Sequence, residues 1–245
     1  MAIASGVLFA GVVLAADAGL IHLYYKQPAR QPLVYSSVVQ EENDAPDAKG
    51  KMQKTTVQTE QTVTNHYKLV GPEVLAVKAQ FSEFKTAVNG KQVAYTPPDK
   101  EAQKLIDVKG YRKMANKGAA DFDKFDVILP NYPVKTGETW TYTAPPTTDL
   151  PVYLVTKFKL VGIEKLQGRD VAVIDAATHV SEVETARKLK ITVSGKGRIV
   201  FAINEGYLVS SEFRIKMVTE PLQGAGAAAT VTRNIKTNMK LVKLG

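Results

Sequence analysis

Hydrophobic and polar residues alternate along much of the chain from residue 51 onward. In Val74–Phe84, the side chains of Leu75, Val77, Ala79 and Phe81 fall on one side and polar ones on the other. A period of two is typical of strands with one buried face, because successive side chains point to opposite faces of a sheet. Comparable runs occupy residues 55–63, 152–161, 171–180, 189–203, 207–219 and 230–244. Short turns separate these runs, so the pattern predicts a long antiparallel meander.

Glycines mark where the predicted strands turn or bend. Asn89-Gly90 lies between two β-prone runs and predicts a tight hairpin, since a type I′ turn needs a positive φ at both residues. Gly195 and Gly197 stand inside a single strand, where they indicate a bulge or a sharp bend.

Helical signals are few in this part of the chain. Residues 99–108 follow two prolines, begin with a capping aspartate and have a helix-forming composition, so they predict one short helix. A second short helix is expected near residues 119–125. We therefore expect a mainly β domain over residues 51–245. Its sheet would curve into a half-open barrel or sandwich with one or two short helices, because a sheet with one apolar face must bury that face.

The first 25 residues have a different character. Gly6–Tyr25 carries no Lys or Arg and a single carboxylate, Asp17. A helix of this length rises about 1.5 Å per residue and reaches across the roughly 30 Å of a bilayer core. The segment therefore predicts an N-terminal hydrophobic helix that contacts a membrane.

Residues 1–26 fit either a signal peptide or a transmembrane anchor. Residues 16–18 (Ala-Asp-Ala) have the small-x-small form of a cleavage site before Gly19, although the start of the chain lacks the usual Lys or Arg. An uncleaved anchor fits the length, but Asp17 and His22 are costly in lipid. Lys26 and Arg30 follow the segment and favour a cytoplasmic domain, whereas the character of the domain favours the cell envelope, facing the periplasm or the exterior.

Residues 27–50 read as a linker between this segment and the β domain. A short β-prone run at residues 33–39 is followed by an acidic, turn-rich stretch at residues 41–50. The whole chain is 44% hydrophobic and 23% charged, which is ordinary for a protein that buries a core. It contains no Cys, which excludes disulfides, thiolate metal sites, Cys nucleophiles and a thioether-linked lipid.

Positive charge is concentrated at the C-terminal end. Residues 187–245 hold eleven Lys or Arg and three acids, and this difference of +8 equals the net charge of the whole chain. A basic outer strand face would suit an anionic lipid surface or an envelope protein partner, although solvated strand faces give the same pattern. Nucleic acid is not expected, because no aromatic platform is repeated among the cations. The predicted basic face consists of Lys188, Lys190, Arg198, Arg214 and Lys216.

No catalytic constellation is recognisable. The histidines, His22, His66 and His179, are far apart, and no metalloprotease or nucleophile-elbow motif occurs. Residues 121–126 (DFDKFD) resemble part of a calcium loop but lack its glycine and distal glutamate. We therefore expect no enzymatic activity, no metal and no cofactor.

A family resemblance is carried by a motif around a single tryptophan. Pro130, Pro133, Gly137 and Trp140 stand in the pattern P-x-x-P-V-x-x-G-[DE]-x-W, and a Gly-Arg-Asp turn and a Gly-Tyr-Leu turn follow later. In this respect the chain resembles a group of bacterial envelope proteins, often lipoproteins, but it lacks their lipid-bearing Cys. The resemblance implies an antiparallel sheet similar to that of periplasmic lipoprotein carriers, with these four residues as structural anchors.

Two functions follow from these expectations. The first is a non-enzymatic envelope protein that binds a lipid or another apolar ligand, or handles lipoproteins, in the concavity of its sheet. The second is a structural component of a membrane-associated assembly, whose concavity is filled by its own side chains.

Overall fold

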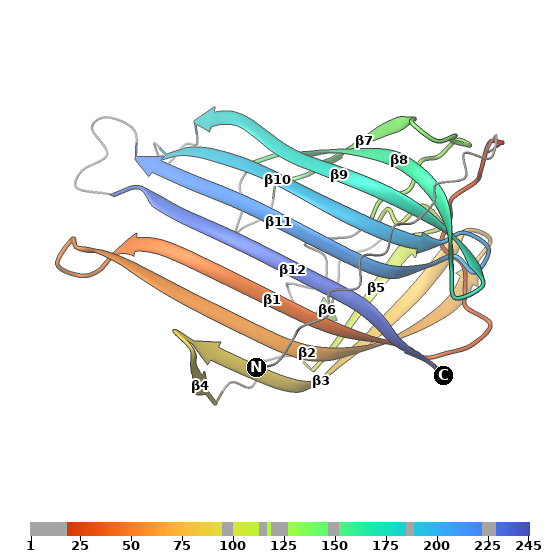
Figure 1. Ribbon diagram of the computed structural model, residues 1–245, viewed down its shortest axis with the longest axis horizontal. Helices are drawn as coiled ribbons and strands as arrows, with labels where there is room; N and C mark the ends of the chain where they lie inside the picture. Colours follow the sequence, from red (N-terminus) through yellow and green to blue (C-terminus); the bar gives the residue numbers. More distant parts are fainter. Residues whose placement is uncertain are drawn as a thin grey trace, which may run out of the picture.

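The computed structural model describes residues 19–94, 100–112, 117–118, 127–146, 152–184, 189–221 and 229–245. These residues form one large antiparallel sheet, which confirms the predicted mainly β fold (Figure 1). Its strands are β1 (Leu33–Pro46), β2 (Met52–Gly71), β3 (Val74–Val88), β4 (Lys91–Val93), β5 (Glu101–Asp107), β6 (Lys117–Gly118), β7 (Thr139–Ala144), β8 (Leu154–Leu166), β9 (Arg169–Glu184), β10 (Leu189–Ala202), β11 (Tyr207–Pro221) and β12 (Val231–Leu244).

The strand order is β6-β5-β3-β2-β1-β12-β11-β10-β9-β8-β7, with β4 paired to β3 beside this path. Most neighbours in the sheet are also neighbours in sequence, as the meander predicts. There are two exceptions. β5 pairs with β3, passing over β4. β1 pairs with β12, which joins the first strand to the last and so unites the two halves of the sheet, β1 to β6 and β7 to β12. Figure 1 shows these two strands at the centre of the sheet, with β5 passing behind them.

The predicted hairpin is confirmed. Asn89 and Gly90 have φ angles of 50° and 76°, and they connect β3 to β4. A second turn with the same signs joins β8 to β9 at Gln167 and Gly168, with φ angles of 50° and 80°. Glycine or asparagine accommodates such angles most easily, so these turns are set locally by the sequence.

The predicted helix at residues 99–108 is wrong, since residues 101–107 form strand β5. Ala102 and Ile106 are buried, and their spacing of four residues suits one face of a helix as well as one face of a strand. Pairing with β3 decides between the two, because Leu75 lies opposite Ile106 and Ala79 opposite Ala102. The helix expected near residues 119–125 lies outside the described residues.

The expected N-terminal helix is not confirmed. Residues 19–25 are extended, and residues 1–18 lie outside the described part of the chain. Leu23 and Tyr25 are buried in the core of the domain, and Ile21 forms a two-way backbone bridge with Val134. Across the described residues, no helix has the length and apolar character needed to cross a membrane.

The expectation that residues 27–50 form a linker is also wrong for residues 33–46. They form β1, which pairs along its whole length with β2 and along most of it with β12. The acidic stretch is compatible with a strand because its charges have partners on both faces. Glu41 pairs with Arg233 at 2.6 Å, and Glu42 pairs with Lys54 at 2.9 Å.

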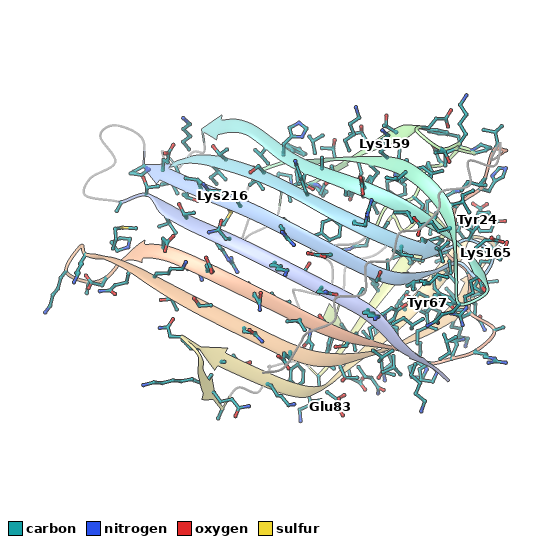
Figure 2. The ribbon with its side chains drawn as sticks, in the orientation of Figure 1. Tyr24, Tyr67, Glu83, Lys159, Lys165 and Lys216 are labelled. Carbon is teal, nitrogen blue, oxygen red and sulfur yellow. The ribbon has the colours of Figure 1, made fainter. Side chains whose placement is uncertain are left out.

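The sheet has two distinct faces, and the predicted alternation is confirmed in β3, β8 and β11. We call the face that carries Tyr35, Leu160 and Phe201 the inner face, because these side chains are fully buried. The opposite, outer face carries most of the exposed charged side chains of β8 to β12, among them Lys159 and Lys216 (Figure 2).

Gly195 and Gly197 do not form the expected bulge. Both lie in regular register with β11 and β9, and the irregular positions of β10 fall at its two ends. Instead, they allow side chains of β11 to approach the backbone of β10 closely. A methyl group on Gly197 would collide with the ring of Phe213, which crosses the inner face at this point.

The main core fills one end of the sheet, which we call the core end. Figure 2 shows side chains crowded there around the labelled Tyr24 and Tyr67. Trp140 is buried as expected: its Nε1 donates to the carbonyl of Ile128 at 2.7 Å, and its ring stacks on Phe158. Pro130 is buried, Pro133 is half-buried, and Gly137 adopts a φ of 92° in the turn before β7.

Candidate functional site

At the core end, the concavity of the sheet is filled by the protein itself. Tyr35 has no exposed surface, and its hydroxyl donates to the carbonyl of Leu208 at 2.8 Å. Burial raises the pKa of Tyr35 well above its usual range, and the neighbouring Tyr67 adds to the shift. Tyr25 reaches the same region and donates to the carbonyl of Val127 at 3.1 Å. These contacts make the core end a structural centre.

The other half of the inner face is also apolar, and most of its apolar side chains are only partly buried. Two neighbouring rows of side chains cross it from β2 to β9. One row holds Glu41, Ile235 and Ile215, and the next holds Arg233, Met217 and Val193. We call the apolar members of both rows the inner apolar patch: Val57, Ile235, Ile215, Met217, Val193 and Val180. Ile215 and Met217 pack against a small buried cluster that includes Val180 and Val193.

A single ion pair interrupts this patch. The guanidinium of Arg233 donates to the carboxylate of Glu41 at 2.6 Å, and both side chains are about one-quarter to one-third exposed. The Nε of Arg233 is buried and has no hydrogen-bond partner among the described residues. An unpaired buried donor is costly, so an acceptor that reached this N–H would stabilise the protein.

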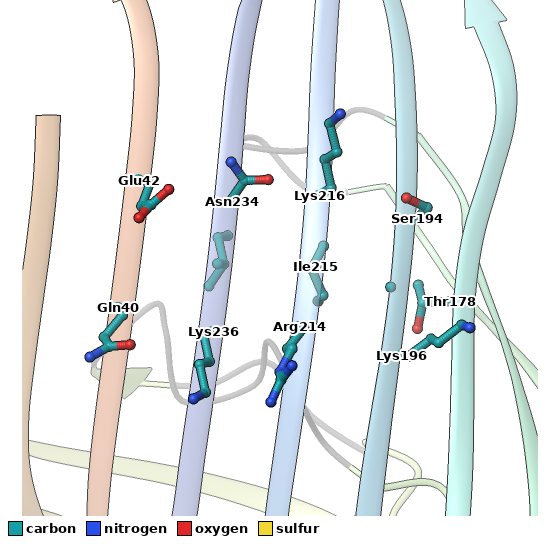
Figure 3. A pocket seen from close by; sticks show the side chains of 12 residues that line it. Gln40, Glu42, Thr178, Ser194, Lys196, Arg214, Ile215, Lys216, Asn234 and Lys236 are labelled. Atoms are coloured by element: carbon teal, nitrogen blue, oxygen red, sulfur yellow. The ribbon is translucent and has the colours of Figure 1, made fainter. Parts of the chain in front are cut away.

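The outer face carries a hollow of about 610 Å³ that runs across β1, β12, β11 and β10 (Figure 3). Two cross-strand rows of side chains form its walls. The first row is Gln40, Lys236, Arg214 and Lys196, and the second is Glu42, Asn234, Lys216 and Ser194. Ile215, Ile235 and Gly195 lie between the rows and point to the inner face, so they contribute backbone to the floor.

The predicted basic face is brought together only in part. Lys190, Arg198, Arg214 and Lys216 do share the outer face, whereas Lys188 lies outside the described residues. Carboxylates are close to three of them. Lys190 pairs with Glu220 at 3.7 Å, Arg198 with Asp175 at 3.2 Å, and Arg214 with Glu212 at 2.9 Å.

The structure adds two cations that the sequence prediction missed. Lys196 and Lys236 lie directly opposite Arg214, one on each neighbouring strand. Within the described residues, neither of them has an ion-pair partner, and the same is true of Lys216. Alternation in β10 and β12 places both on the outer face, but their alignment with Arg214 depends on the register between strands.

The titratable residues considered for catalysis do not come together at one site. His22, His66 and His179 are exposed, and four strands separate the last two in the sheet. The part of the chain that the structure describes contains no group of three or more His, Asp or Glu side chains positioned to hold a metal ion. The aspartates of residues 121–126 lie outside it.

Comparison with known proteins supports the fold. No protein-family model and no curated protein matches the chain. A solved structure described as lipid–protein interactions in lipovitellin is similar over 89% of this chain, with a TM-score of 0.57 and 9% sequence identity. The similarity spans 26% of the lipovitellin chain, about a quarter of its length. DynF from the dynemicin biosynthesis pathway of Micromonospora chersina aligns over 93% of this chain and 88% of its own, at 8% identity and a TM-score of only 0.25.

Proposed function

We propose that this protein is a non-enzymatic lipid-binding protein that holds an acyl chain against the inner apolar patch. The observation that carries the proposal is the chemistry of the inner face beyond the core end. Apolar side chains from five strands surround one ion pair, and a buried N–H of that pair has no acceptor among the described residues. Binding sites for apolar ligands typically combine such a lining with a few polar groups that fix orientation.

The similarity to lipovitellin supports the same proposal. The structure of that protein concerns lipid–protein interactions, and 89% of the present chain has the same fold as about a quarter of the lipovitellin chain. Identity of 9% carries no residue across, so the argument for this chain rests on its own inner face.

We place the protein in the cell envelope as part of this proposal. The apolar segment at residues 6–18 would direct export, with cleavage before Gly19. This choice is supported by Leu23 and Tyr25, which pack in the domain core and would be withdrawn from it by a helix that extended to residue 25 in a membrane.

Native mass spectrometry tests lipid binding directly. The protein is incubated with vesicles of phosphatidylethanolamine and phosphatidylglycerol, re-isolated, and examined for lipid adducts. We expect one adduct per chain in the wild type and a loss of most of it in a variant with Met217→Asn and Ile235→Asn. Val218→Asn is the matched control, because Val218 follows Met217 on β11 but points to the outer face.

The outcomes separate the two candidate functions. Adducts that persist in the double variant would place the lipid away from the inner apolar patch. A wild-type protein without any adduct would favour the structural alternative, which is supported by a core end that the protein fills with its own side chains.

A further inference from the structure

We infer that the outer hollow is a second binding site, one that takes a linear acidic polysaccharide. The site is independent of the inner apolar patch, because its walls are side chains of the opposite face. Its distinguishing feature is a line of three cations on three adjacent strands, Lys236, Arg214 and Lys196, with Lys216 beside them in the second wall (Figure 3).

This alignment is unfavourable for the free protein. Side chains that lie directly opposite on neighbouring strands are only about 5 Å apart, and like charges at that distance destabilise a sheet. Arg214 is relieved by Glu212, whereas Lys196 and Lys236 have no carboxylate partner within the described residues. A ligand with several negative charges would remove this repulsion.

The direction of the hollow favours a chain over a flat surface. Its walls cross the sheet from β1 to β10, which is three strand spacings or about 14 Å. At one end of the order, β5 and β6 lie behind the central strands, so the sheet curves and the hollow follows its outward-curved surface (Figure 1). A flexible polymer follows such a path, whereas a membrane would touch only its crest.

The lining distinguishes between polymers. It contains no aromatic side chain on which the bases of a nucleic acid would stack. Gln40 stands at the end of the line of cations, and Asn234 and Ser194 flank Lys216, so the lining also provides neutral hydrogen-bonding groups. The carboxylate of Glu42 in the second wall is paired with Lys54 at 2.9 Å. Cations combined with amides and a hydroxyl match a chain that carries both carboxylates and hydroxyl groups, which is the chemistry of a polyuronate.

Binding of polygalacturonate at low and physiological salt tests the inference. The variant K196Q/R214Q/K236Q is expected to bind about 100-fold more weakly at low salt. Each cation near an anionic partner strengthens binding about fivefold, and the variant removes three of them. The matched control K159Q/K240Q/K243Q removes the same charge from exposed outer-face positions away from the hollow, and it is expected to lose less than about threefold.

A second pair of variants tests the position of the polymer. Ser194→Glu places a negative charge in the wall of the hollow and is expected to weaken binding far more than Ser194→Gln, which adds similar bulk without charge. Circular dichroism is the check that every variant is folded. These side chains are exposed, so their replacement is expected to leave the fold intact.

Three results would overturn the inference. Equal losses in the two triple variants would mean that net charge alone attracts the polymer. Equal binding of inorganic polyphosphate would show that hydroxyl groups are not recognised. Binding of phosphatidylglycerol vesicles without binding of polygalacturonate would make the outer face a membrane-docking surface instead.

Discussion

Single residues at the core end and beside it determine how closely the strands pack. Gly197 leaves room on β10 for the buried ring of Phe213, and Gly195 does the same for Ile215. Tyr35 fills the centre of the core and satisfies its hydroxyl with the carbonyl of Leu208. These residues have little freedom to change, because their neighbours belong to other strands.

Gly197→Ala is expected to lower the free energy of unfolding by about 1–3 kcal/mol, the usual cost of forcing an extra methyl group into a packed core. The added Cβ would also lie 2.9 Å from the carbonyl oxygen of Glu212, which cannot move without disturbing β11. Urea denaturation measures the change. Gly162→Ala is the control, since no heavy atom beyond its chain neighbours lies within 4 Å of the added Cβ. A similar loss in both variants would indicate a backbone effect and contradict the packing argument.

Tyr35 should make the protein less stable in alkali. Its pKa is raised in the folded state, so above about pH 10 the unfolded chain loses a proton that the folded protein keeps, and unfolding is favoured. The contribution of Tyr35 to the free energy of unfolding should therefore be constant below pH 9 and fall as the pH rises through 10 and 11.

Tyr35→Phe removes that part of the pH dependence, although it lowers stability at neutral pH by leaving the carbonyl of Leu208 unpaired. The pKa values of Tyr111 and Tyr207 are also raised by burial, so a smaller alkaline decline should remain. Tyr153→Phe, at an exposed position, is the control. Parallel pH profiles for wild type and Tyr35→Phe would contradict the assignment.

At the scale of elements, the extended segment at residues 19–26 belongs to the domain. It enters the core through Leu23 and Tyr25, and the backbone N–H of Lys26 donates to the carbonyl of Gly206 at 2.9 Å. Lys109 donates to the carbonyl of Leu23 at 2.8 Å, and burial lowers the pKa of its ammonium. This segment therefore connects the loops at the core end.

Truncation tests this role. A chain that begins at residue 19 should unfold at the same urea concentration as the full chain. In a chain that begins at residue 27, the free energy of unfolding should be lower by more than about 3 kcal/mol, because a buried leucine alone contributes that much. Within the segment, Leu23→Ala should lower the free energy of unfolding because Leu23 is fully buried. Leu20→Ala should leave it unchanged because Leu20 is 65% exposed. Full stability of the chain from residue 27 would show that the segment is dispensable.

At the scale of the whole molecule, one sheet and one principal core span both halves of the chain. The pairing of β1 with β12 continues the sheet across the halves, and the core cluster combines Leu75, Trp140 and Phe201 from distant parts of the sequence. Neither half of the sheet, β1 to β6 or β7 to β12, can keep its core when the other half unfolds.

We therefore expect a single cooperative unfolding transition. The fluorescence of Trp140 reports on the half that contains β7 and β8, while far-ultraviolet circular dichroism reports on all strands. The two signals should change at the same urea concentration. A circular dichroism transition that precedes or follows the fluorescence change would mean that the strands before β7 unfold separately.

Local pattern alone determined much of this protein. Alternation in β3, β8 and β11 predicted both the strands and the faces on which Phe158 and Phe213 lie, because a side chain's side of the sheet follows from its parity along the strand. The Asn89-Gly90 hairpin and the burial of Trp140 could equally be predicted from the sequence, since turn geometry and large apolar surface act over short range.

Only the tertiary structure decided which strands meet and in what register. Residues 101–107 became a strand because β3 offers them an edge, and residues 33–46 became the centre of the sheet because β2 and β12 pair with them on either side. The line of Lys236, Arg214 and Lys196 arises in the same way. Parity along each strand places the three cations on the outer face, but their alignment depends on contacts between segments far apart in sequence, which no local pattern contains.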